Sequence, residues 1–323
     1  MQCFGQLTRL IVDLSKEHFG YLPIDPPADI IAKIPSEIPQ FLDNTQASRE
    51  LRSAYVQHVI SKTLTYRIFQ PFLFTLGRRY DKADTFFQML SMDIRRKSVR
   101  REAYWRQQTL KAAYTTSDAK QAINVVAAVI VDEIIDHIRH FADPKHLDQL
   151  LVGVRKIVKL AAETWRLARV ERELIISTMP SAEDEQTVNE GWKEFTYDPA
   201  PSPTAQEADN EKHSVRRRRV LLRMCPRIYR EPVHEDFNED GEKSTQCVYL
   251  PGVVLYADSP SVLARKMEIA RKTADPYGSG SGTPAVGPTG NDGDNPSDLP
   301  LDTAVENNAV DQDAGTPAVE VAA

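Results

Sequence analysis

Apolar residues recur every three or four positions through most of the first 180 residues, which is the spacing of helices that bury one face. The first such segment covers residues 1–19. Residues 20–42 hold five prolines and predict a connector with short helical turns at most. Helical spacing returns in three further segments, which are 46–69, 81–97 and 100–114.

Two longer helices are expected next. The segment from about 117 to 141 is apolar all round in Ile123–Val131, so we expect that helix in a central, buried position. The following helix begins at Asp143 and carries an apolar stripe that includes Trp165. We expect it to continue to Met179, because a proline comes directly after that residue.

The spacing changes from helical to alternating in the last third of the chain. Residues 220–228 and 247–257 alternate in the manner of β-strands. The acidic loop Glu231–Glu242 between them contains a glycine and permits a hairpin. A short helix is expected to follow, from Asp258 to Arg271.

These patterns predict a mainly α fold, an antiparallel helical bundle followed by a small β-hairpin plus helix, with a disordered acidic linker and tail. The bundle is residues 1–180, and residues 181–215 form the flexible acidic linker. Within the linker, Trp192, Phe195 and Tyr197 are candidates to dock back onto the bundle. The hairpin and short helix, residues 216–272, are expected to dock on the bundle, and residues 273–323 form the disordered tail.

Charge is distributed unevenly along the chain. All nine charged residues after Lys272 are acidic, so removing them from the net charge of −6 leaves residues 1–272 at +3. The three cysteines are scattered and form no C-x-x-C pair, which favours a reduced, intracellular compartment. No signal peptide is apparent, and the longest apolar run, Val125–Val131, is too short to span a membrane. We therefore expect a soluble protein of the cytoplasm or nucleus, without a membrane span.

The four consecutive arginines Arg216, Arg217, Arg218 and Arg219 admit three interpretations. They resemble a nuclear-localisation patch, and they could also contact the phosphates of a nucleic acid. The third interpretation is structural, since Arg219 begins a strand face beside the acidic loop 231–242, whose carboxylates would pair with the arginines.

A second basic cluster interleaves with aromatic residues and is a candidate basic contact surface. Its members are Arg95, Arg96, Lys97, Arg100, Arg101 and Arg106. Because Tyr104 and Trp105 lie among them, the cluster superficially resembles a site that stacks bases and binds phosphates. The alternative is a solvated helix face with a core tryptophan, in which Glu102 pairs with Arg106 four residues later.

Motifs for catalysis or metal binding are sparse. Glu133, His137 and His140 share one helical face, but no H-E-x-x-H and no second Glu-x-x-His helix accompanies them. There is no phosphate-binding loop of the G-x-x-x-x-G-K-[ST] type and no G-x-S-x-G elbow. Cys225 precedes a proline within a strand pattern and is interpreted as a packed thiol. We assign no catalytic residue, no metal ligand and no cofactor.

Three segments carry a resemblance to a known group of proteins, namely REAYWRQQTL (101–110), VLLRMCPRIYREP (220–232) and YLPGVVLYADSPSVLARKMEIA (249–270). There the chain resembles uncharacterised helical proteins of filamentous fungi that have no assigned activity. The resemblance covers about residues 1–272 and excludes the tail. It implies an intracellular eukaryotic protein and supplies no functional residues.

The function expected from these observations is protein–protein interaction or regulation without catalysis, through the long helix and the strand hairpin. The partner is expected to be a protein. One alternative is a nuclear factor with weak nucleic-acid contact through the two basic clusters. A second alternative is an enzyme whose active site lies in the bundle and leaves no trace in the linear sequence.

Overall fold

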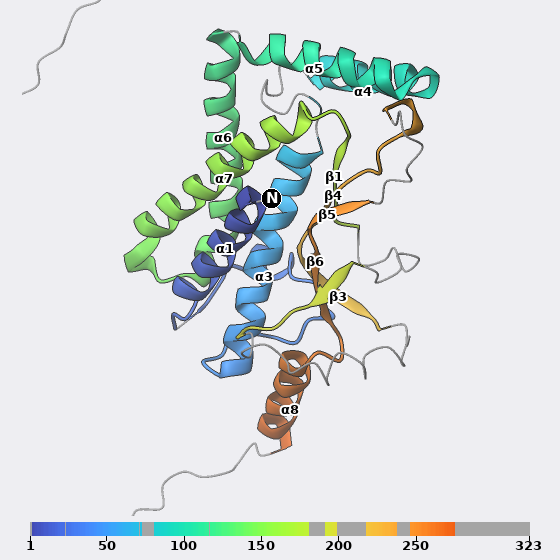
Figure 1. The fold of residues 1–323 in the computed structure, drawn as a ribbon. Coiled ribbons are helices and arrows are strands. Elements are labelled where there is room, and N and C mark those ends of the chain that lie inside the picture. Colours follow the sequence, from blue (N-terminus) through green and yellow to red (C-terminus); the bar gives the residue numbers. More distant parts are fainter. Residues whose placement is uncertain are drawn as a thin grey trace, which may run out of the picture. The chain divides into compact units, whose positions relative to one another are not determined.

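The helical segments expected from the sequence fold as helices in the computed structural model (Figure 1). The structure describes residues 2–22, 24–70, 72, 81–115, 117–180, 191–198, 218–237 and 246–274. All of these belong to one unit, Met1–Pro276, while Tyr277–Ala323 form a second unit. The helices are α1 (Gln2–Glu17), α2 (Ala28–Ile31), α3 (Gln46–Leu64), α4 (Asp81–Lys97), α5 (Val99–Thr115), α6 (Ser117–Ile138), α7 (Leu147–Arg169) and α8 (Pro260–Ala274).

Helices α1, α3, α6 and α7 pack on one another and enclose the main core. The apolar stripe of α1 faces α3 and α7, and α6 also contacts both of those helices. At Gly153 of α7 a Cβ atom would lie 2.6 Å from Cδ1 of Leu14, so the missing side chain allows α1 to approach closely. Trp165 is almost completely buried in this core, as the spacing predicted.

The central helix is α3, and the expectation that α6 would be central is wrong. Helix α3 packs against other helices and also against the strand Val220–Cys225, so it is buried around its whole circumference. Its polar residues pair with Ser15 of α1 inside the core: the Ser15 and Ser53 hydroxyls lie 2.9 Å apart, and Gln57 Nε2 donates to Ser15 Oγ at 2.9 Å. In contrast, the α6 residues Val125 and Val129 are 58% and 45% exposed.

Helix α7 ends at Arg169, so the expectation that it continues to Met179 is wrong. The side chain of Arg106 accounts for the end, because its Nη1 donates to the carbonyl oxygens of Arg169 and Glu171 at 2.5 and 2.8 Å. At the C-terminal end of an α-helix the backbone carbonyl groups have no hydrogen-bond donor within the helix itself, so these oxygens need a donor from elsewhere. Ile175 and Ile176 follow and begin strand β1 (Ile175–Thr178), because β-branched residues favour the strand conformation.

The hairpin predicted from residues 220–228 and 247–257 is present as two consecutive pairs of strands. Strand β3 (Val220–Cys225) pairs antiparallel with β6 (Gly252–Tyr256), and β4 (Arg227–Arg230) pairs antiparallel with β5 (Cys247–Leu250). Both long strands are interrupted by a proline, at Pro226 and Pro251. Since proline donates no backbone hydrogen bond, the ladder divides into two three-stranded sheets, β1-β4-β5 and β2-β6-β3.

Strand β2 (Trp192–Glu194) lies inside the segment predicted to be a linker and pairs parallel with β6. The Trp192 ring packs on Gly252, where a Cβ atom would lie 2.2 Å from the ring. Phe195 is buried in the main core and Tyr197 packs against it, so the predicted docking of these aromatic residues is confirmed. Residues 181–190 and 199–217 lie outside the described part of the chain, as does the predicted tail except Thr273 and Ala274, which end α8.

Three fully buried arginines connect the helices to the loops around them. They are Arg52 of α3, Arg106 of α5 and Arg265 of α8. Each donates to backbone carbonyl oxygens, and Arg52 does so at Phe19 and Phe41 (2.7 and 3.0 Å). Burial lowers the pKa of Arg52 to about 10, so it stays charged at neutral pH. The buried guanidinium groups therefore satisfy backbone acceptors that no regular secondary structure reaches.

Candidate functional site

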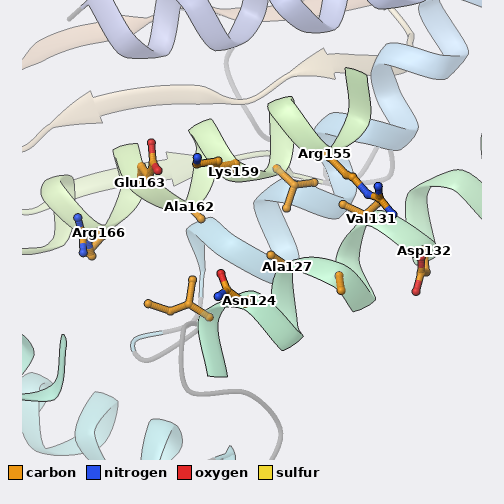
Figure 2. A pocket seen from close by; sticks show the side chains of 12 residues that line it. Asn124, Ala127, Val131, Asp132, Arg155, Lys159, Ala162, Glu163 and Arg166 are labelled. Atoms are coloured by element: carbon orange, nitrogen blue, oxygen red, sulfur yellow. The ribbon is translucent and has the colours of Figure 1, made fainter. Parts of the chain in front are cut away.

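A groove of about 630 Å³ lies between α6 and α7 (Figure 2). Its apolar floor is formed by Ala127 and Val131 from α6 and by Val158 and Ala162 from α7. Alanine side chains from both helices occupy this floor where a leucine would fill the space. The hollow is therefore a consequence of small side chains on two facing helices.

Charged side chains border the apolar floor. Arg155, Lys159, Glu163 and Arg166 come from successive turns of α7, and Asp132 comes from α6. Figure 2 shows Asp132 and Arg166 at opposite ends of the groove. None of these five groups has an ion-pair partner within the part of the chain that the structure describes.

The groove is elongated. Arg155 and Arg166 are eleven residues apart on α7, which corresponds to about 16 Å along the helix axis. This shape suits a segment of polypeptide lying along the two helices better than a small molecule held at one point.

The four-arginine run is only partly described, because Arg216 and Arg217 lie outside the described residues. The guanidinium of Arg218 forms two hydrogen bonds to the Glu194 carboxylate (2.7 and 2.8 Å) and two to Asp258 (both 2.9 Å). These hydrogen bonds hold the pKa of Glu194 below its usual value. Arg219 pairs with Glu37. The two described arginines are thus engaged in ion pairs with carboxylates outside the acidic loop that the sequence suggested, of which residues 238–242 are not described.

The second basic cluster does not form a single surface. Arg106 is buried and pairs with the buried carboxylate of Glu102 at 2.9 Å, so its inclusion in a contact surface is wrong. Arg95 is partly buried and pairs with Glu231. The remaining members are exposed at the turn between α4 and α5, and they are Arg96, Lys97, Arg100 and Arg101.

Of the two neighbouring aromatic residues, only Trp105 differs from what a stacking site needs. Trp105 is half-buried and packs with Phe72 and Phe87, at ring-centroid distances of 5.9 and 6.1 Å. Tyr104 is 68% exposed. The tryptophan therefore belongs to a small secondary core between α4 and α5, and the interpretation as a core tryptophan is confirmed.

Two of the three residues of the histidine pattern make internal contacts, and the third, His140, lies beyond the end of α6 at Ile138. Glu133 pairs with Arg67 at 3.1 Å, and His137 Nε2 lies 2.8 Å from the hydroxyl of Tyr55. Among the described residues, no three metal-binding side chains come together. Cys225 is buried, and burial raises its pKa to about 12, so its thiol is protonated at neutral pH and is a poor nucleophile.

We expect the stability of the fold to decrease as the pH falls from about 6.5 to 5. Burial lowers the pKa of both His58 and His137 to about 4. The unfolded chain therefore binds protons in this range that the folded chain does not, which costs on the order of 1–2 kcal/mol for each histidine at about pH 5. Carboxylates with lowered pKa values, such as Asp43, lose their contribution to stability only when the pH falls below this range.

Urea unfolding at about pH 7.5 and pH 5 checks this expectation. The variant His58→Asn/His137→Gln should show a much smaller loss between the two pH values, because neither replacement titrates. An equal loss in the variant and in the original chain would contradict the assignment to these histidines.

Comparison with protein-family models, with curated proteins and with solved structures found no match for this chain. The resemblance to fungal proteins stays a prediction. No helix in the described residues combines the length and the apolar character that a membrane span requires.

Proposed function

We propose that this chain is a non-enzymatic intracellular interaction protein that binds an amphipathic helical segment of a partner protein in the groove between α6 and α7. The observation that supports this proposal is a groove between two helices, bordered by charges that find no ion-pair partner among the described residues. An amphipathic helix that places its apolar face in such a groove is a common mode of peptide recognition.

The dimensions of the groove favour a short helix as the occupant. About 16 Å of groove accommodates three turns of helix, whose apolar residues at positions i, i+3, i+4 and i+7 would cover Ala127, Val131, Val158 and Ala162. Val131, Val158 and Ala162 are already buried in the free chain, so the partner's own apolar face and the exposed charges of α7 supply most of the driving force for binding.

Charge favours an acidic partner. The α7 wall carries three cations, Arg155, Lys159 and Arg166, against the single carboxylate of Glu163. A partner with acidic residues beside its apolar face would pair with these cations, which raises its rate of association and selects against basic partners.

The arrangement of polar groups supports binding rather than catalysis. A catalytic site brings an acid, a base or a nucleophile within hydrogen-bond distance of one reacting atom. Here the charged side chains are distributed along about 16 Å of α7. The described residues that line the groove include no histidine, cysteine, serine or threonine.

The proposal predicts that a labelled amphipathic peptide of about 16 residues, with leucines on one face and glutamates beside them, binds the intact chain. Fluorescence anisotropy measures the affinity. Ala162→Leu fills the floor, and Lys159→Glu reverses a wall charge, so we expect each to weaken binding by roughly tenfold. Lys156→Glu is the matched control, since it makes the same charge change on the same helix outside the groove.

Two further peptides complete the test. A scrambled sequence and a version with lysine in place of glutamate should both bind much more weakly. If the acidic amphipathic peptide fails to bind, or if Lys159→Glu and Lys156→Glu behave alike, the groove is not the site. Thermal unfolding of each variant establishes that a loss of binding does not reflect loss of the fold.

A further inference from the structure

The outward side of α4 presents large apolar side chains to solvent. Phe86, Met89 and Met92 are 61%, 61% and 52% exposed. At about 100° per residue they lie within an arc of about 120°, so they form one stripe along α4. Three large apolar residues in one stripe form a continuous patch rather than the scattered exposure that is ordinary on protein surfaces.

Met89 and Met92 are not among the residues that pack in the core of the α4–α5 hairpin, and Phe86 touches that core only through its neighbour Phe87, at a ring-centroid distance of 5.9 Å. The opposite side of α4 faces α5, where Phe87 packs with Trp105 and Phe72 in the secondary core. The buried hydroxyl of Ser91 donates to Glu102 at 2.8 Å on the same side. The hairpin therefore has its own core without the stripe.

Cations gather at the end of the stripe. Arg96, Lys97, Arg100 and Arg101 are all exposed around the turn between the two helices. Among the described residues only one of them, Arg96, has a carboxylate partner, the exposed Asp93 at 3.0 Å. Arg96 follows Met92 by four residues and Met89 by seven, so it continues the same side of the helix. The surface is thus apolar along α4 and cationic at the turn.

We infer that the α4–α5 hairpin binds the surface of an anionic phospholipid bilayer. A helix with an apolar stripe can lie in the plane of the interface with that stripe at the boundary between headgroups and acyl chains. Clusters of lysine and arginine on such a helix are attracted to anionic headgroups. Phe86, Met89 and Met92 would enter the boundary, while the cations of the turn meet the lipid phosphates.

A nucleic acid explains the same surface less completely. It would pair with Lys97, Arg100 and Arg101, but it would leave the two methionines of the stripe in water. Base stacking needs exposed aromatic rings interleaved with the cations, and only one ring on α5 meets this need: Tyr104 is exposed, whereas Trp105 is half-buried in the secondary core. The combination of stripe and cations therefore favours a lipid surface.

Sedimentation of the full chain with vesicles tests this inference. The chain should sediment with vesicles of phosphatidylcholine containing about 30% phosphatidylserine and not with phosphatidylcholine alone, and binding should fall steeply as salt rises from about 0.05 to 0.5 M. Lys97→Glu/Arg100→Glu/Arg101→Glu should lower the partition coefficient by more than tenfold. Phe86→Ser/Met89→Ser/Met92→Ser should lower it by roughly tenfold even at low salt.

Matched controls keep the result specific. Lys111→Glu changes an exposed cation of α5 away from the turn, and Val152→Ser changes an exposed apolar residue of α7, so both should bind as the original chain does. Lys159→Glu should also leave vesicle binding unchanged, which separates this surface from the α6–α7 groove. Circular dichroism checks that the variants fold.

Three results would overturn the inference. They are absence of binding at low salt, equal binding to neutral and anionic vesicles, and unchanged binding in the stripe and turn variants. Salt-dependent binding of a single-stranded oligonucleotide, together with failure to sediment with anionic vesicles, would assign the cations to a nucleic acid instead.

Discussion

Replacement of Arg106 by methionine is expected to lower the free energy of unfolding by about 3–5 kcal/mol. Arg106 is 1% exposed, and its Nε donates to the fully buried carboxylate of Glu102 at 2.9 Å. Its two terminal nitrogens donate to the carbonyl oxygens that follow the end of α7, including that of Arg172 at 3.0 Å. The variant would leave a buried carboxylate and several backbone acceptors without their main donor, and each of these carries a desolvation cost.

A double-mutant cycle with Glu102→Leu separates these contributions. If the buried ion pair dominates, Arg106→Met/Glu102→Leu should recover part of the stability lost in Arg106→Met, since no unpaired charge remains. The stability that stays lost then reports the carbonyl oxygens at the end of α7. Urea unfolding measures all four chains. A loss below about 1 kcal/mol in Arg106→Met would contradict the buried position of this side chain.

Replacement of Trp165 by alanine is expected to destabilise the fold by about 3–5 kcal/mol as well. Trp165 is one of the largest fully buried side chains, and its ring centroid lies 4.8 Å from that of Phe69. It projects from α7 into the core that α7 shares with α1, α3 and α6. Truncation removes apolar burial and leaves a cavity that a packed helical core refills only in part.

Trp105→Ala is the matched control for Trp165→Ala. Trp105 is half-buried in the small core of the α4–α5 hairpin, so its loss should cost less, about 1–2 kcal/mol. Trp165→Phe, which keeps most of the apolar volume, should also fall well below the alanine variant. Equal destabilisation by Trp165→Ala and Trp105→Ala would contradict the assignment of Trp165 to the main core.

Helical periodicity predicted the mainly α fold because it reports directly which faces are buried. The stripe of α1 and the position of Trp165 on α7 are both as the spacing indicates. The hairpin was also predictable, since apolar and polar residues alternate visibly in both long strands. Pro226 and Pro251 only divide each of these strands into two. These elements are encoded locally, and local encoding is what a single sequence reveals.

Elements that depend on distant contacts were not predictable. Helix α7 ends at Arg169 because Arg106, more than sixty positions earlier, supplies donors to its last carbonyls. Helix α3 is central although it carries buried polar residues, because Ser15 of another helix pairs with Ser53 and Gln57. Sequence spacing cannot show that a polar side chain has found its partner inside the core.

The groove was missed for a related reason. The run Ile123–Val131 is apolar all round, and that pattern alone does not distinguish a buried helix from one with an open apolar face. The available signal was the small size of Ala127 and Ala128 together with Ala162 on the next helix. Small residues on two neighbouring helices can let the helices approach closely, or they can leave a hollow between them. The sequence does not distinguish these two outcomes, because they depend on where the helices lie in space. The charged residues of α7 that border the groove lie off the buried stripe of that helix.

Methyl NMR of the intact chain, titrated with the acidic amphipathic peptide, tests the central claim most directly. If the groove is the binding site, the methyl signals of Val131 and Val158 shift in a saturable manner, while those of the control residues Val152 and Val248 stay in place. Both controls lie outside the groove. Saturable shifts confined to other methyl groups, or no saturable shift at all, would contradict a binding function for the α6–α7 groove.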